Sequence, residues 1–105
     1  MAESKAYERL QRKITIENLW LYIIKVLKDS SELRAYDIKK ELSHRFNVKP
    51  ATITVYAVIY KMVKEGLIEP VKNSEGLRYR VTEKGIKTFE QGIKYINEII
   101  GMLST

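Results

Sequence analysis

The sequence predicts a mainly α-helical chain with one short β-hairpin, and three observations lead to this fold class. Apolar residues recur at intervals of three and four over most of the chain, which is typical of amphipathic helices. After Gly66 the pattern changes to two short extended runs, LIEPVK and LRYRV, which are typical of short strands. The 105 residues include no cysteine, which excludes disulfides and thiolate metal sites.

Two helices are predicted before residue 50. One spans 14–28, and the preceding ESKAYERLQRK also favours a helix, so the two segments are either continuous or separated by a kink near Ile14. The next spans Ala35 to Phe46, and NVKP ends it because the residue before a proline avoids the helical region. Its apolar side is expected to carry Tyr36, Ile38, Leu42 and Phe46.

The stretch ATITVYAVIY, residues 51–60, resembles a strand in both its composition and its alternation. Its continuation favours a helix. Val55, Ile59 and Met62 are spaced by four and three residues, and a second stripe of Thr54, Ala57, Lys61 and Lys64 is spaced by three, four and three. We therefore interpret it as a helix over about 50–65, whose start Pro50 suits and whose end Gly66 marks, with the exact first residue left open.

A hairpin is predicted over 68–81, with NSEG as the turn between the strands. Pro70 cannot donate a backbone hydrogen bond and confines the first strand to an edge. In the second strand Leu77, Tyr79 and Val81 face one way, whereas Arg78 and Arg80 face the other.

The last helix is predicted to begin near Thr82, which can cap it. Six apolar residues follow in a heptad pattern, which favours packing against another helix. The stripe packs either on the first helix of the same chain or on a second copy, and we favour a homodimer. The expected interface residues are Ile86, Phe89, Ile93, Ile96, Ile100 and Leu103.

The charge is concentrated in the middle of the chain. The formal net charge is +6, and the stretch from Arg34 to Arg80 holds ten basic and five acidic residues. A basic small domain indicates a polyanionic partner. The longest apolar run, LWLYII, is too short to span a membrane, and no signal peptide is visible. We expect a soluble cytoplasmic protein without membrane contact.

No residue pattern indicates catalysis or a bound cofactor. The chain has no nucleophile with a matched base, no phosphate-binding loop and no paired carboxylates at a workable spacing. His44 is the single histidine and has no second ligand near it, so we expect no metal site. The chain is therefore not expected to be an enzyme.

Three helices, a basic hairpin and a further helix follow one another in the order of a winged helix-turn-helix. In such proteins the third helix enters the major groove of DNA, here about 50–65. The hairpin, about 68–81, would be the wing on the backbone or minor groove. Residues 1–82 are expected to form the DNA-binding part and residues 83–105 the dimerisation helix, as one compact unit.

The stretch KPATITVYAVIYKMVKEGLI resembles the recognition helix of PadR-like transcriptional regulators, through Pro50, Tyr56, Gly66 and neighbouring positions. LRYRVTEKG and AYDIKKEL are similar to the segments that follow the wing and open the second helix in that family. Ile53 stands where the family usually has Gly. The resemblance implies a homodimeric DNA-binding repressor with a long C-terminal helix at the dimer interface. It also implies that a flat aromatic effector is a candidate ligand, for which Trp20 and Tyr22 are the candidate contacts.

Double-stranded DNA is therefore the expected partner. The hydroxyl and methyl groups of Thr and the charge of Lys suit phosphates and base edges. The alternative interpretation of these residues is an ordinary solvated helix face. For Tyr56 the alternative is an aromatic side chain packed in the core. The alternative function is a winged-helix module that binds proteins of the transcription machinery. The candidate DNA-binding residues are Lys39, Lys49, Thr52, Thr54, Tyr56, Lys61, Lys64, Lys72, Arg78 and Arg80.

Overall fold

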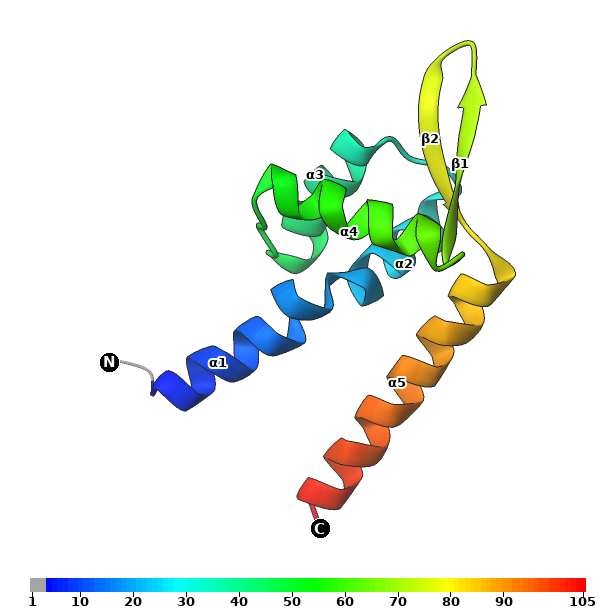
Figure 1. Cartoon of the computed structure of the whole chain (residues 1–105). Coiled ribbons are helices and arrows are strands. Elements are labelled where there is room, and N and C mark those ends of the chain that lie inside the picture. Colours follow the sequence, from blue (N-terminus) through cyan, green and yellow to red (C-terminus); the bar gives the residue numbers. More distant parts are fainter. Residues whose placement is uncertain (1–3) are drawn as a thin grey trace.

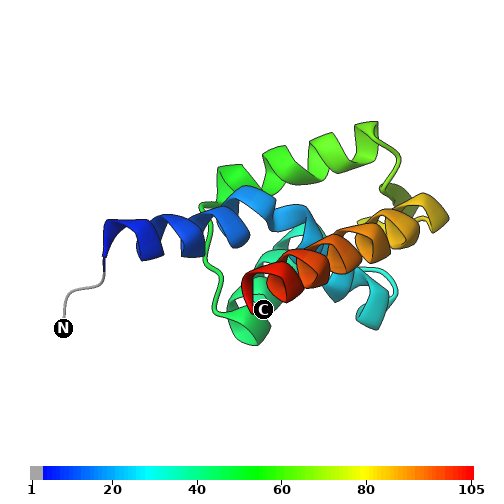
Figure 2. The same ribbon diagram turned by 90° about the horizontal axis from the view of Figure 1, so that it is seen from below.

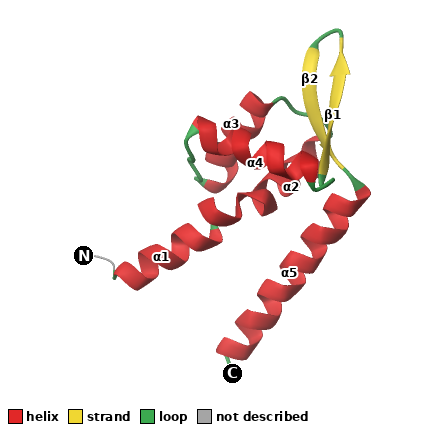
Figure 3. Ribbon diagram, viewed as in Figure 1, coloured by secondary structure: helices red, strands yellow, loops and turns green. Residues whose placement is uncertain are grey.

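The computed structural model describes residues 4–105, which form five α-helices and one β-hairpin (Figures 1 and 3). The predicted order of helices and hairpin is confirmed. The helices are α1 (Lys5–Ile14), α2 (Leu19–Ser30), α3 (Ala35–Phe46), α4 (Thr52–Lys64) and α5 (Glu83–Leu103), and the strands are β1 (Ile68–Asn73) and β2 (Gly76–Val81).

The first predicted helix is divided at Thr15, whose backbone angles (φ −103°, ψ −84°) are not helical. The Thr15 hydroxyl donates to the carbonyl of Gln11 at 2.7 Å, and the Asn18 amide donates to the carbonyl of Lys13 at 2.6 Å. Such bonds from side chains to nearby backbone compete with helix continuation. The chain therefore makes a short 3-10 turn before α2, so of the two predicted alternatives the kink near Ile14 is the one observed.

Helix α2 lies at the centre of the hydrophobic core and packs against α3, α4, α5 and β2. Tyr36 of α3 was predicted to share the core side with Ile38, but it is 63% exposed whereas Ile38 is fully buried. Residues two apart in a helix do not share a face, which explains this error. The core contains Leu19, Ile23, Ile24, Val26, Leu27, Ile38, Leu42, Val55, Ile59 and Met62.

The stretch 51–60 is helical, so the interpretation of ATITVYAVIY as part of a helix is confirmed. Val55, Ile59 and Met62 are all buried, as their spacing predicts. The helix begins at Thr52 rather than at Pro50. Ala51 has extended backbone angles (φ −60°, ψ 149°), so it precedes the first turn instead of belonging to it.

The end of α4 is a Schellman turn around Gly66. Gly66 has a positive φ of 77°, its N–H donates to the carbonyl of Val63 at 3.0 Å, and the N–H of Leu67 donates to the carbonyl of Met62 at 2.9 Å. A side chain at position 66 would be strained by this backbone conformation. The turn directs the chain from the end of α4 straight into β1.

The two strands of the hairpin pair antiparallel, with Ile68 opposite Val81, Pro70 opposite Tyr79 and Lys72 opposite Leu77. Opposed residues share one face of a sheet and faces alternate along a strand. Because Ile68 is buried in the core, and Pro70 and Tyr79 line a cleft with residues of α4, the base of this face is turned toward α4. The opposite face carries Glu69, Arg78 and Arg80, so the predicted alternation of apolar and basic residues along β2 is confirmed, whereas Lys72 of β1 lies on the face of Tyr79.

Helix α5 begins where the sequence predicts, because the hydroxyl of Thr82 accepts a hydrogen bond from the N–H of Gly85 at 3.0 Å. Its first half packs against α2. A Cβ atom on Gly92 would lie 3.1 Å from the side chain of Leu21 and 3.2 Å from that of Trp20. Gly92 thus lets the two helices approach closely.

The far halves of α1 and α5 extend beyond the core as separate arms (Figure 1). Seen from below, α1 projects away from the body while α5 passes beneath it (Figure 2). The described chain measures 51 × 30 × 21 Å. None of the helices within residues 4–105 is long and apolar enough to cross a membrane.

Candidate nucleic-acid interface

The outer face of α4 is a predicted site element that the structure leaves open to solvent. Burial of Val55, Ile59 and Met62 fixes the rotation of the helix about its axis. No acidic residue occurs in its thirteen residues. Thr54, also a predicted contact, is half-buried at the edge of this face. The exposed side chains are Thr52, Ile53, Tyr56, Ala57, Tyr60, Lys61 and Lys64.

Arginines and lysines differ in this part of the chain. All four arginines between residues 34 and 80 pair with carboxylates: Arg34 with Asp37, Arg45 with Asp29, Arg78 with Glu75, and Arg80 with Glu69. Among the described residues, none of the six lysines in this stretch lies within 4 Å of a carboxylate oxygen. The positive charge that is free to meet a polyanion is therefore carried by lysine.

The wing arginines are the most tightly engaged of the predicted contacts. The Arg80 Nε atom donates to Glu69 Oε1 at 2.8 Å, and its NH1 atom lies 3.8 Å from Glu32 Oε2. The hydrogen bond that Arg80 donates to Glu69, and then the negative charge of Glu69, raise the pKa of Arg80. Arg78 NH2 lies 3.1 Å from Glu75 Oε2. Both arginines are on the wing face that points away from α4.

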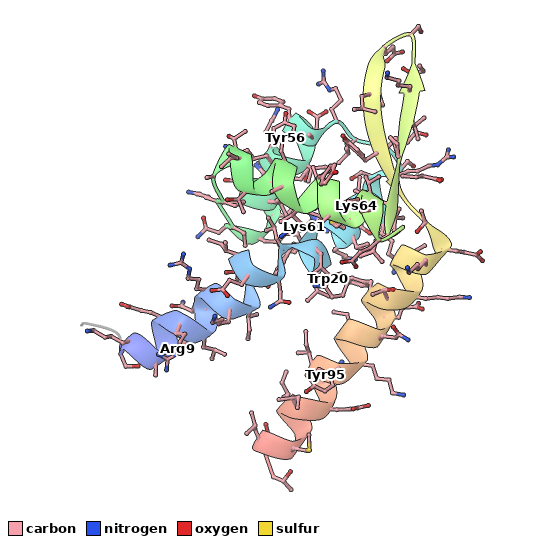
Figure 4. The ribbon with its side chains drawn as sticks, in the orientation of Figure 1. Arg9, Trp20, Tyr56, Lys61, Lys64 and Tyr95 are labelled. Carbon is pink, nitrogen blue, oxygen red and sulfur yellow. The ribbon has the colours of Figure 1, made fainter. Side chains whose placement is uncertain are left out.

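The predicted lysines fall into two groups. Lys61 and Lys64 lie on the outer face of α4, with Lys64 at the end nearest the wing (Figure 4), and Lys72 lies on the wing face turned toward α4. Lys39 and Lys49 line a shallow hollow between α3 and the turn before α4, together with Tyr36 and Pro50. Both groups border α4, one near each of its ends.

The residues predicted to contact an effector are not brought together. Trp20 is half-buried and packs against Gly92 of α5. Tyr22 stacks edge-on against Phe46 with the ring centres 5.2 Å apart, and its hydroxyl donates to the carbonyl of Ile14 at 3.0 Å. Burial raises the pKa of Tyr22. The two side chains thus serve different packing contacts.

The predicted dimer stripe is only partly covered by its own chain. Phe89 packs at the edge of the core, and Lys28 Nζ lies 5.5 Å from its ring centre. Ile86 and Ile96 are half-buried. Exposure then rises along the helix, from 40% at Ile93 to 53% at Ile100 and 81% at Leu103.

Sequence reasoning missed three residues of this interface. Ile53 is 79% exposed and Tyr60 is 64% exposed on the outer face of α4, and Tyr79 of β2 lines the same cleft as Tyr56 and Tyr60. The spacing 53, 56, 60, 64 carried a signal for the first two, because it follows the helical period. Tyr79 could be found only from the strand register. Within residues 4–105 no group of three His, Cys, Asp or Glu side chains is placed to hold a metal.

The fold matches solved winged-helix structures across most of the chain. A transcriptional regulator from Clostridium thermocellum is 19% identical, with a TM-score of 0.75 over 98% of this chain and 96% of that one. A PadR-like transcriptional regulator from Bacillus cereus is 22% identical, with a TM-score of 0.67 over 89% and 95%. F93 from STIV, a winged-helix DNA-binding protein, is 20% identical, with a TM-score of 0.70 over 82% and 94%. The sequence matches no protein-family model and no curated protein.

Proposed function

We propose that the chain is a PadR-like transcriptional regulator that binds double-stranded DNA as a homodimer. The observation that carries this proposal is the outer face of α4, which is exposed, has lysines without carboxylate partners and contains no acidic residue. A helix in this position of a winged helix is the one that enters the major groove. The solved structures that share the fold include several transcriptional regulators, which supports the same conclusion.

In this proposal, Lys61 and Lys64 neutralise phosphates, because a lysine carries a compact positive charge on a flexible stem that reaches the anionic DNA backbone. The exposed methyl groups of Thr52 and Ile53 suit the methyl group of thymine. The arginines of the wing are held by carboxylates, so the base reading is assigned to α4. Repression fits such a protein, since a dimer seated on a promoter blocks polymerase by occupancy alone.

The homodimer is supported by two apolar stripes that face solvent. One is the end of α5 with Ile93, Ile100 and Leu103, and the other is Tyr7, Leu10 and Ile14 of α1, which has no buried residue. Exposed apolar faces of this kind mark interaction sites. Two copies joined through these arms would present two α4 helices to half-sites about 34 Å apart.

The test begins with selection of bound duplex fragments from the genome of the source organism. Binding of a selected fragment is then titrated with wild type, Lys61→Ala, Lys64→Ala and the control Lys87→Ala, whose exposed lysine lies on α5. Loss of one phosphate contact should lower the slope of log affinity against log salt by about 0.9. We expect this loss for the two α4 variants and not for Lys87→Ala. Equal slopes for all four proteins would contradict the assignment of α4 to DNA.

One observation favours a second candidate function. Ile53, Tyr56 and Tyr60 make part of the outer face of α4 apolar and aromatic, which also suits a module that binds another protein. We rank DNA binding above protein binding because α4 carries lysines and no acidic residue. If wild type retains no duplex fragment even at low salt, the protein-binding function becomes the better account of this face.

A further inference from the structure

A shallow cleft separates α4 from the base of the wing. Its walls are mostly apolar and aromatic, and no carboxylate lines it. Three tyrosines meet there, two from α4 and one from β2. The lining residues are Tyr56, Ile59, Tyr60, Val63, Pro70 and Tyr79.

Tyr79 is held in this cleft by its backbone. Its N–H donates to the carbonyl of Leu33 at 2.8 Å, and its carbonyl accepts from the N–H of Leu33 at 3.1 Å. These bonds join the edge of β2 that is not paired with β1 to the segment between α2 and α3. The pairing with Pro70 places the Tyr79 side chain on the wing face that is turned toward α4. The position of Tyr79 relative to α4 is thus fixed by the fold.

The tyrosine hydroxyls of the cleft have no partner within residues 4–105, whereas the hydroxyl of Tyr22 in the core has one. Tyr79 is half-buried, and Tyr56 and Tyr60 are 51% and 64% exposed. Burial raises the pKa of Tyr79, and the charge of Tyr56 adds to this effect, so these two phenols lie within electrostatic reach. The Tyr79 hydroxyl is not a buried unpaired group, so it meets solvent at the cleft, where a group from outside can accept its hydrogen bond.

The charge around the cleft indicates what that partner is. Lys64 Nζ lies 5.5 Å from the centre of the Tyr60 ring, and Lys72 lies on the same wing face as Tyr79. Neutral hydroxyl donors between apolar walls, with lysines at the rim, suit the sugar–phosphate backbone of DNA, in which apolar sugar faces alternate with anionic oxygens.

We propose that Tyr60 and Tyr79, together with Tyr56, bind the backbone of one DNA strand in the cleft between α4 and the wing. The phenol hydroxyls donate to phosphate oxygens, and the rings contact the sugars. This contact sets how deeply α4 enters the groove. The inference rests on the proposed function, and it adds contact residues that carry no charge.

The test measures duplex affinity by fluorescence anisotropy for wild type, Tyr60→Phe, Tyr79→Phe and the control Tyr95→Phe. Tyr95 is 62% exposed on α5, far from the cleft (Figure 4). Each substitution removes only a hydroxyl and keeps the ring. One lost hydrogen bond to a charged group corresponds to roughly tenfold or more in the dissociation constant, so we expect Tyr60→Phe and Tyr79→Phe each to bind about tenfold more weakly.

Two further readouts separate this contact from other effects. The salt slope should remain that of wild type, because no cation is removed. Affinity for a selected fragment and for an unrelated duplex should fall by the same factor, because backbone contacts carry no sequence information. The melting temperature of each variant, measured without DNA, should equal that of wild type.

The outcomes are distinguishable. If wild type binds DNA and both cleft variants bind as tightly as wild type, the inference is overturned and the proposed function stands. If Tyr95→Phe weakens binding as much as Tyr79→Phe, the effect does not belong to the cleft and the inference is again overturned. If wild type binds no duplex at low salt, both the inference and the proposed function fall.

Discussion

At residue 85 the chain has no room for a side chain. A Cβ atom on Gly85 would collide with the carbonyl oxygen of Leu67, and it would lie 2.9 Å from a methyl group of Val81. That same oxygen accepts hydrogen bonds from the N–H of Thr82 at 3.1 Å and from its hydroxyl at 3.0 Å. A glycine is therefore needed where α5 leaves the wing, and the reason is space.

Gly85→Ala should destabilise the protein by about 1–3 kcal/mol, the usual cost of overpacking a tight contact. Gly101→Ala is the matched control, because it lies in the same helix with nothing within 4 Å of its added Cβ atom. It should stabilise the fold by up to about 1 kcal/mol through helix propensity. Urea unfolding of both variants checks this. Equal effects of the two substitutions would show that the Leu67 contact does not matter.

At the level of single residues, the sequence predicts those features that depend on local backbone chemistry. The left-handed Asn47 that ends α3, the cap at Thr82 and the turn at Gly66 were predictable because each depends on local backbone chemistry. The close packing of Gly92 on Trp20 was not predictable. This packing depends on which side of α5 meets α2. The heptad pattern does not determine the rotation of α5 about its axis to within one residue.

Among the elements, α4 shows how tertiary structure overrides local preference. Its β-branched and aromatic residues favour a strand, yet Val55, Ile59 and Met62 bury one helical stripe in the core. The stripe was visible in the sequence as spacings of four and three, so the element type could be predicted. The start of α4 at Thr52 could not be predicted. A proline is tolerated both inside the first turn of a helix and just before the helix, and Pro50 occupies the position before it.

The wing is an element whose predicted role changes with the structure. The sequence shows two arginines on one strand face, but not that Glu69, Glu32 and Glu75 lie beside them. Glu69 and Glu32 are distant from Arg80 in the sequence. The strand register brings Glu69 opposite Arg80, and the segment before α3 brings Glu32 close to it. The interaction is exposed and weak in isolation, yet it competes directly with phosphate.

Glu75→Gln should therefore strengthen DNA binding. The substitution releases Arg78 at the wing tip and removes one negative charge that repels phosphate. We expect the slope of log affinity against log salt to steepen by about 0.9 if Arg78 gains one phosphate contact. Titrations at several salt concentrations measure this. Glu90→Gln, which removes an exposed carboxylate from α5, should leave the slope unchanged, and an unchanged slope in Glu75→Gln would place the wing tip away from DNA.

At the scale of the whole molecule, the two arms distinguish this chain from a self-contained domain. The core is closed around α2, but Ile100 and Leu103 of α5 and Leu10 of α1 remain more than half exposed. Burial of these residues would require a partner, which the proposed homodimer supplies. The sequence predicted the stripe on α5, whereas α1 was predicted only as a helix, because its exposure depends on the turn at Thr15.

Ile93→Asp and Ile100→Asp should convert the proposed dimer to monomer, because each places a charge in the apolar stripe. Gln91→Asp is the control, since Gln91 is exposed on the opposite side of α5. Sedimentation equilibrium measures the mass of each protein. In wild type the melting temperature should also rise with protein concentration, as expected for a folded dimer. A monomeric wild type, or a Gln91→Asp variant that dissociates equally, would contradict the interface.

The composition of α4 has a consequence for the chain before it folds. Residues 51–60 are all uncharged, include no proline, and contain eight β-branched or aromatic residues of high strand propensity, which is the signature of a segment prone to aggregate. Pro50 and Lys61 stand at its two ends, in the places where gatekeeper residues limit such association. The lysine that we propose contacts DNA in the folded protein thus also protects the newly made chain.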